Sequence, residues 1–217
     1  MKLAIIGGTG KQGRALAARF AHAGVEVILG SRDAERAVVA ANELYLHTHV
    51  HRVVGLNNHD AAHAAEIVLL SVPYDGMIPI LAEVREAVQH KIVINIASAL
   101  DPERKSRAKV PLAGSTTAEI QHYFGEHVRV VAAFQNIAPE ALASHDVKVN
   151  SDVLVCGADR PSRESVIALI EQAGMRAVDA GVLANAVAVE TLTAILIAIN
   201  IKYKIKGAGI HITGLPV

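Results

Sequence analysis

The sequence predicts an α/β fold: a Rossmann-type doubly wound parallel sheet with a small C-terminal α/β extension. Short apolar runs alternate with helix-favouring segments along the chain, a pattern typical of parallel strands joined by right-handed helical crossovers. The first run, Leu3 to Ile6, leads through Gly8-x-Gly10-x-x-Gly13 into the helix-favouring residues 14–20. Strand, glycine turn and helix in this order match the dinucleotide-binding fingerprint.

The other elements can be assigned in order along the chain. We expect strands at residues 3–6, 25–29, 53–54, 67–70, 91–95 and 128–132. Helices are expected at 14–20, 34–44, 61–65 and 117–124, with a further helix that follows 71–75 and runs to 88. Residues 101–113, which carry charge and two prolines, are expected to form a loop. The last part should contain a strand at 153–156, a helix at 161–172, a strand at 175–178 and an apolar helix near 183–200.

Size and composition indicate a compact globular protein. The 217 residues are 52% hydrophobic and 19% charged, enough to bury a large core. Lys+Arg and Asp+Glu balance at 21 each, so no bulk charge recruits nucleic acid or an anionic membrane. The single cysteine excludes an intramolecular disulfide and is consistent with a reducing cytoplasm. Polar residues interrupt the apolar stretch 187–201, which favours a buried or interface helix over a membrane span.

The glycine turn predicts a phosphate-binding loop. Gly8 should permit a tight turn, Gly10 should let the backbone approach a pyrophosphate, and Gly13 should let helix and strand pack closely. The helix that follows points unsatisfied N–H groups and its positive dipole end at the phosphates. The predicted contacts are therefore Gly8, Thr9, Gly10, Lys11, Gln12 and Gly13.

The residues after the second expected strand favour NADP over NAD. An acidic residue there would accept hydrogen bonds from the ribose 2′-hydroxyl of NAD, whereas arginine accommodates the 2′-phosphate of NADP. This chain has Ser31 and Arg32, with Arg36 one helical turn further on. Both guanidiniums can reach one face and make charge-assisted contacts to phosphate. The alternative is that the two arginines are solvated charges at a helix start, either of which could pair with Asp33.

The ordered motifs of the chain resemble those of the coenzyme F420-dependent NADP oxidoreductase family. The resemblance rests on Gly7-Gly-Thr-Gly-x-x-Gly13, Gly30-Ser-Arg32, Val72-Pro-Tyr74, Ala118-Glu-Ile120, Val153-x-Val-Cys-Gly157, Asp179-Ala-Gly-x-Leu183 and Glu190-x-Leu-Thr193. It covers nearly the whole length. The resemblance implies hydride transfer between NADPH and the 5-deazaflavin F420, in a homo-oligomer of two or four chains with a small C-terminal domain.

The resemblance also implies site residues. The family's phosphate loop is matched by Thr9 to Gln12, and its 2′-phosphate site by Ser31, Arg32 and Arg36. The residues that line the cofactor in the family correspond to Tyr74 and Ile78. Where the family can have a histidine before Thr-Ile-Pro, this chain has Phe134-Gln135-Asn136-Ile137-Ala138, and Gln135 can donate a hydrogen bond to a ring carbonyl. We expect the nicotinamide to be bordered by Ser71, Val72, Pro73, Tyr74 and Ser98. The facing pocket should be formed by Gln135, Asn136, Ile137 and the tail from 212 to 215, including Leu215.

The chain should therefore divide into an NADP-binding Rossmann domain, 1–140, and a small C-terminal domain, 141–217. The second domain would complete the substrate pocket and the oligomer interface. Since no catalytic triad or carboxylate pair is evident and the redox chemistry would belong to the cofactors, we assign no catalytic residue. Two other functions stay open: an NADPH-dependent reductase of another flavin, a metal chelate or a small carbonyl, and an NADPH-sensing regulatory protein.

Several reactive side chains have a structural interpretation instead. Three histidines occupy alternate positions, His47, His49 and His51, so that on a strand they could bind a metal from one face. A surface segment without metal is the favoured interpretation. Cys156 is expected to be an inert buried thiol, and Asp179 a turn or cap residue. Glu190 interrupts an apolar helix and is expected to pair with Lys or Arg, from this chain or a partner subunit. The stripe Leu192, Ile195, Leu196 and Ile199 is predicted to be core or dimer interface.

Overall fold

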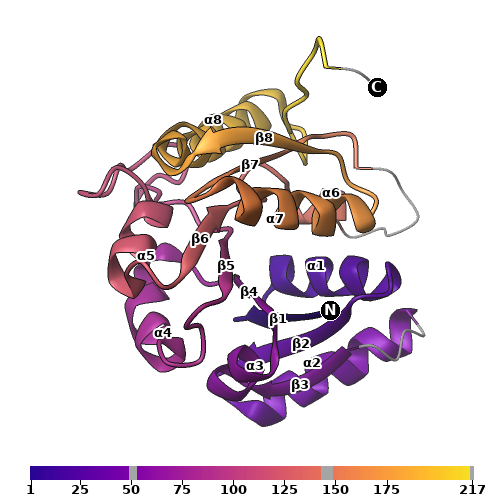
Figure 1. Cartoon of the computed structure of the whole chain (residues 1–217). Coiled ribbons are helices and arrows are strands. Elements are labelled where there is room, and N and C mark those ends of the chain that lie inside the picture. Colours follow the sequence, from indigo (N-terminus) through magenta and orange to yellow (C-terminus); the bar gives the residue numbers. More distant parts are fainter. Residues whose placement is uncertain (49–52, 143–148, 216–217) are drawn as a thin grey trace.

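The computed structural model describes residues 1–48, 53–142 and 149–215 (Figure 1). The strands are β1 (Lys2–Ile6), β2 (Glu26–Ser31), β3 (Val53–Asn57), β4 (Ile67–Leu70), β5 (Ile92–Asn95), β6 (Arg129–Ala132), β7 (Val153–Gly157) and β8 (Ala177–Val182). The helices are α1 (Lys11–His22), α2 (Ala34–Thr48), α3 (Asn58–Ala64), α4 (Met77–Val84), α5 (Thr116–Phe124), α6 (Pro139–Leu142), α7 (Arg160–Gln172) and α8 (Ala186–Tyr203). Short 3-10 turns at Tyr74–Gly76 and Leu183–Asn185 precede α4 and α8.

The strands form one sheet in the order β3-β2-β1-β4-β5-β6-β7-β8, which confirms the predicted Rossmann-type α/β class. All pairs from β3 to β6 are parallel. The parallel pairing ends at β6: β7, in the predicted C-terminal extension, runs antiparallel to β6 through Val131↔Gly157 and Ala132↔Cys156, while β8 pairs parallel with β7. An antiparallel neighbour can start at the end where the previous strand stops, so β7 needs no crossover helix to reach its place. The sheet is continuous across residue 140.

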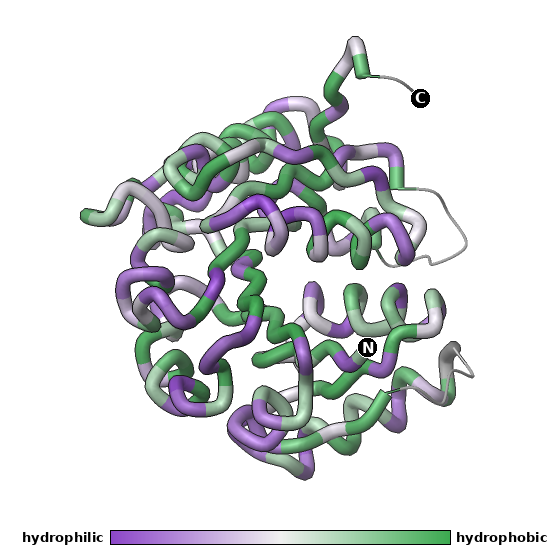
Figure 2. Tube along the Cα trace, viewed as in Figure 1, coloured by the Kyte–Doolittle hydropathy of each residue, from purple (hydrophilic) through white to green (hydrophobic). Residues whose placement is uncertain are grey.

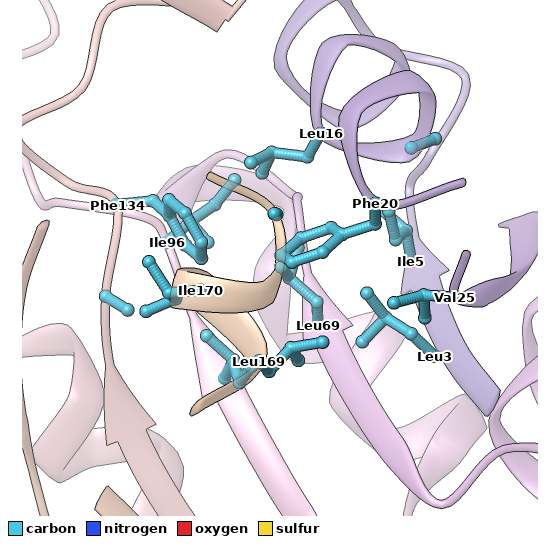
Figure 3. Close-up of a cluster of buried hydrophobic side chains, with 14 of the residues drawn as sticks. Leu3, Ile5, Leu16, Phe20, Val25, Leu69, Ile96, Phe134, Leu169 and Ile170 are labelled. Carbon is cyan, nitrogen blue, oxygen red and sulfur yellow. The ribbon is translucent and has the colours of Figure 1, made fainter. Parts of the chain in front are cut away.

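Alternation along the strands divides the core between the two faces of the sheet. Leu3 and Ile5 of β1 point to the face that α1 and α7 cover, where they pack in one cluster with Phe20 of α1 and Leu169 of α7. Figure 3 shows this cluster. Ala4 and Ile6 point to the other face and pack in a second cluster that takes in residues of α3, α4 and α5. The strands at the centre of the molecule are mostly green in Figure 2, as a sheet covered on both faces requires.

Several element boundaries differ from the prediction. The third strand extends to Asn57 because β3 pairs with β2 over five residues, from Val27↔Val53 to Ser31↔Asn57. Helix α4 ends at Val84 rather than at 88. Met175 ends α7 instead of starting a strand, because its N–H bonds to the carbonyl of Ile170 after Gly174 at φ +72°, a Schellman cap.

Helix α8 is the most exposed apolar element. Within the described ranges, the stretch Leu183–Tyr203 is the one helical segment long and apolar enough to cross a membrane, and 22% of its apolar 18-residue window is buried in the chain. Its inward side packs Ala186 and Val189 against Leu154 and Cys156 of β7. Ile195 on its outward side is 53% exposed, and Ile201 near its C-terminal end is 67% exposed. The part of the predicted stripe near Ile195 is therefore not core in a single chain.

Candidate cofactor and substrate site

The phosphate loop connects β1 to α1 in a tightly packed turn. Gly7 adopts the left-handed backbone, φ +71°, so the strained turn position lies one residue before the predicted Gly8. Gly8 is needed for packing, because a Cβ there would lie 2.6 Å from the Ile5 carbonyl oxygen and 2.7 Å from a Leu29 methyl. A Cβ on Gly13 would lie 2.8 Å from the Gly8 Cα, so helix and loop touch as predicted.

Gly10 and the start of α1 form an open cradle. A Cβ on Gly10 would meet the Gly7 carbonyl oxygen at 3.5 Å and nothing closer, so the space above it is available to a ligand. Gly10 is the N-cap of α1; it has no side chain to cap the helix, and the first turn carries no acidic residue. The first N–H groups of α1 are thus left to an anion, with the positive end of the helix dipole behind them. These features fit the pyrophosphate of a dinucleotide.

A hollow of about 440 Å³ beside this cradle fits the 2′-phosphate end of the cofactor. Its lining includes Gly7, Thr9, Gly10, Ser31, Arg32, Asp33, Arg36, Asn58, Ser71, Val72, Pro73, Gly76 and Ile80. Asp33 does not pair with the arginines: its Oδ1 accepts from the backbone N–H groups of Glu35 (3.0 Å) and Arg36 (3.3 Å) and caps α2. Among the residues that the structure describes, neither Arg32 nor Arg36 has an ion-pair partner. Both cations are available to phosphate.

A second hollow of about 410 Å³ continues from the first at the carboxyl ends of β4 and β5. The two share Gly10, Ser71, Val72 and Pro73. The second is also lined by Lys11, Gln12, Tyr74, Asp75, Ile96, Ala97, Ser98, Leu100, Lys105, Gln135 and Thr193. The crevice beyond the carboxyl ends of parallel strands is where open α/β sheets bind their ligands. One extended dinucleotide can therefore lie across both hollows with its ring end in the second.

Lys11 and Gln12 tie the loop to the segment that follows β6. The Lys11 ammonium forms an ion pair with Glu140. The Gln12 Nε2 donates to the carbonyl oxygens of Phe134 at 3.4 Å and Ile137 at 3.5 Å. The loop is thus held against residues 134–140, which include the stretch Gln135 to Ile137 that the sequence assigned to the facing pocket.

Hydrogen bonds connect the second hollow to the interior. The Ser98 hydroxyl lies 2.9 Å from the Thr193 hydroxyl, which donates to the Gln135 carbonyl at 3.0 Å. The Gln135 Nε2 donates to the Asn95 carbonyl at 2.8 Å, while Oε1 is buried without a partner in the described part of the chain. One of the two Nε2 donors of Gln135 is thus engaged inside the chain, and its donation to a ring carbonyl stays a prediction.

Besides Gly8 and Gly13, which pack the loop, four of the predicted contacts lie outside both hollows. Asn136 is buried and donates from Nδ2 to the Val189 carbonyl, and Ile137 belongs to the core. Ile78 is 63% exposed and lines a separate hollow beside Tyr74 and Glu119. Leu215 is exposed in the tail. A role for these four residues in binding stays a prediction.

Sequence reasoning did not assign Lys105, Thr193 or Asn58 to the site. Lys105 belongs to the loop between β5 and α5, and Thr193 to the apolar helix α8. Four basic residues between 104 and 109 were the available signal for Lys105. Thr193 reaches the site because α8 packs back against β7, a contact that only the tertiary structure shows.

The partner of Glu190 differs from the predicted Lys or Arg. Glu190 is 3% exposed, and no cation pairs with it within the described residues. Its carboxylate instead accepts from Thr116 N at 2.7 Å, Thr117 N at 2.9 Å and Thr117 Oγ1 at 2.6 Å, at the start of α5. Burial raises the pKa of Glu190, and these hydrogen bonds to the charged form oppose that shift. The partner of the buried acid is a helix N-terminus, not Lys or Arg.

The other reactive side chains have structural roles or lie outside the described residues. Cys156 is buried on β7, as predicted, and burial raises the pKa of its thiol to about 12. Asp179 lies within β8 rather than at a turn, and its Oδ1 accepts from Arg163 Nε and Gly181 N, both at 2.8 Å. His49 and His51 fall outside the described ranges, within which no group of three His, Cys, Asp or Glu could hold a metal.

The phosphate loop and the cradle at the switch of a doubly wound sheet define the class of dinucleotide-binding Rossmann proteins. Residues 2–99 match a family model described as NADP oxidoreductase coenzyme F420-dependent. An F420-dependent NADP reductase from Methanocaldococcus jannaschii is 39% identical over the full length of both chains, and one from Methanothermobacter marburgensis is 40% identical over both. The chain belongs to the F420-dependent NADP reductase family.

Solved structures support the fold. A crystal structure from Arthrobacter sp. FB24 superposes with a TM-score of 0.85 at 23% identity, covering 98% of this chain and 99% of that one. A pyrroline carboxylate reductase from Plasmodium falciparum, solved with NADP bound, has a TM-score of 0.57 at 16% identity and covers 94% of this chain and 62% of the other.

Proposed function

We propose that this protein transfers hydride between NADPH and the deazaflavin F420. The observation that carries the proposal is the pair of joined hollows, which runs from two available arginines, past the open N-terminus of α1, to a pocket at the carboxyl ends of β4 and β5. The full-length identity to F420-dependent NADP reductases supports F420 as the second substrate.

The contribution of the chain to this reaction is binding and alignment. NADPH supplies the hydride and the deazaflavin accepts it, so both reactive groups come from cofactors. The 2′-phosphate would be held by Arg32, Arg36 and Ser31. The pyrophosphate would bind at Gly10 and the start of α1. The segment Ser71 to Tyr74, with Ser98, would border the nicotinamide. Holding two rings in a reactive geometry can contribute about 7 kcal/mol or more to the acceleration, without an acid or base.

The direct test is an absorbance assay with NADPH as donor and a panel of acceptors. The protein should bleach the deazaflavin absorbance of F420 and should react slowly or not at all with FMN, FAD and ferric chelates. An enzyme that reduces one of the other acceptors and leaves F420 untouched would refute the proposal.

Arg32 provides a test of cofactor choice. Replacing Arg32 with alanine should raise the NADPH Michaelis constant about ten- to a hundredfold, because a charge-assisted phosphate contact contributes about 1.5–3 kcal/mol. The constant for NADH, which has no 2′-phosphate, should change little. Steady-state kinetics with both cofactors measure the two effects, and equal effects on NADPH and NADH would contradict a 2′-phosphate role.

We also propose a cytoplasmic homo-oligomer that assembles through α8. The exposed Ile195 lies on the outer side of this helix and gives it an apolar surface that a second copy could cover. The C-terminal residues 141–217 would then form a small domain that completes the substrate pocket and the interface. Light scattering behind a sizing column should give twice or four times the 22.9 kDa chain mass, and Ile195→Glu should lower it. A wild-type mass near 22.9 kDa would refute this arrangement.

A further inference from the structure

A third hollow lies beside the predicted ring pocket. It has a volume of about 490 Å³ and lies between the loop 103–106 and helix α8, lined by Glu103, Arg104, Lys105, Ser106, Ile197, Ala198, Ile201 and Lys202. Lys105 lines this groove and also the second hollow. The groove therefore begins where the ring pocket ends.

Helix α8 forms one wall of both spaces. Thr193 lines the ring pocket, and Ile197 and Ile201 line the groove. These residues are spaced at i, i+4 and i+8, so they share one side of the helix. At 1.5 Å of rise per residue, the stripe extends about 12 Å beyond the ring pocket. A molecule whose ring occupies the pocket has a continuous path along α8.

The polar lining of the groove is mainly basic. Arg104, Lys105 and Lys202 oppose the single carboxylate of Glu103. Arg104 Nε donates to the Ser106 hydroxyl at 3.3 Å, and the Lys202 ammonium lies 5.5 Å from the centre of the Tyr203 ring. For the described residues, none of the three cations takes part in an ion pair. The excess positive charge is available to a ligand.

The loop that carries Arg104 and Lys105 has a defined backbone. The Asp101 carboxylate accepts from the N–H groups of Glu103 at 2.9 Å and Arg104 at 3.0 Å. Leu100 pairs with Ala108 in an antiparallel bridge, which closes the loop at its base. These contacts define the backbone from which the Arg104 and Lys105 side chains extend into the lining of the groove.

We propose that this groove binds the anionic side chain of the deazaflavin substrate. Beyond its ring and polyol, F420 carries a phosphodiester followed by carboxylates, and these groups match the charge of Arg104, Lys105 and Lys202. The stem of the side chain would lie along Ile197 and Ile201. The inference rests on the proposed function and assigns a second part of the same substrate to a site of its own.

The test compares F420 with the same deazaflavin that keeps its polyol but lacks the phosphate and the carboxylates. The double variant Arg104→Gln, Lys202→Gln should raise the Michaelis constant for F420 about tenfold and leave those for NADPH and the truncated acceptor unchanged. Raising the ionic strength from about 0.05 M to about 0.5 M should weaken wild-type binding of F420 more than that of the truncated acceptor. Lys2→Gln, at the amino end of the central strand β1 and away from the site, is the matched control and should change none of these constants.

The possible failures are distinguishable. If the wild type reduces neither deazaflavin, the proposed function fails, and the groove assignment fails with it. If the wild type reduces both deazaflavins, the proposed function stands. The groove assignment is then overturned if the double variant changes the Michaelis constants for F420 and for the truncated acceptor equally, or changes neither of them. Unchanged thermal unfolding of the double variant identifies its effect as one on binding.

Discussion

Replacing Gly10 with alanine should abolish tight NADPH binding while leaving the fold intact. The added Cβ would lie 3.5 Å from the Gly7 carbonyl oxygen and meet nothing closer within the chain, and φ is an ordinary −74°. The methyl would instead occupy the space through which a pyrophosphate reaches the start of α1. Losing those contacts should cost on the order of 3 kcal/mol or more, at least about a hundredfold in affinity. Calorimetric titration with NADPH measures this loss.

The unfolding temperature of the Gly10 variant should stay close to that of the wild type. A poorer helix cap and a stiffer unfolded chain act in opposite directions, each by about 1 kcal/mol or less. Gly13→Ala is the contrasting variant, because its Cβ would press on the Gly8 backbone at 2.8 Å and should lower stability as well as affinity. NADPH affinity that survives Gly10→Ala would show that the cofactor does not approach this residue.

Removing the Glu190 carboxylate should be among the most destabilising single changes in the protein. Glu190→Ala would leave the buried N–H groups of Thr116 and Thr117 without their acceptor and would open a void between α5 and α8. Unsatisfied buried donors cost about 1–3 kcal/mol each, so a total loss of about 3 kcal/mol is expected. For a chain of this size that lowers the melting temperature by about 6–12 °C. Glu171→Ala, on the exposed surface of α7, is the matched control.

The same residue should give the stability a pH dependence. Because burial raises the pKa of Glu190, the folded chain holds this proton more tightly than the unfolded chain does. The stability added by protonation is fully present below the unfolded pKa of about 4.3 and is lost as the pH rises through the folded value. The difference in unfolding free energy between wild type and Glu190→Gln, followed from acid to neutral pH, should show this slope. A difference that does not vary with pH would contradict the assignment.

Removal of the Glu190 carboxylate should also affect the substrate site. Thr117 Oγ1, which donates to Glu190, accepts from Asn95 Nδ2 at 2.9 Å, and the Asn95 carbonyl accepts from Gln135 at 2.8 Å. These bonds link the buried acid to the ring pocket through the side chain of Thr117, the side chain and backbone carbonyl of Asn95, and the side chain of Gln135. Loss of the acid therefore loosens the support of Gln135 as well as the start of α5.

Much of the fold and one half of the site could be predicted because the signals are local. The fingerprint Gly8 to Gly13 lies between its strand and its helix, and Ser31, Arg32 and Arg36 follow the next strand directly. Their function depends on backbone geometry and charge within a few residues. Apolar runs marked the strands for the same reason, although Met175 was assigned to a strand when it is part of a helix cap.

The sequence by itself determined the class of fold, the phosphate loop and the preference for NADP, because each depends on neighbouring residues. The tertiary structure decided the antiparallel placement of β7, the acceptor role of Glu190 and the meeting of Lys105, Gln135 and Thr193 around one pocket. Glu190 lies 73 residues from Thr117 along the chain. Such pairings are set by how the helices pack on the sheet, and no short pattern of residues encodes that packing.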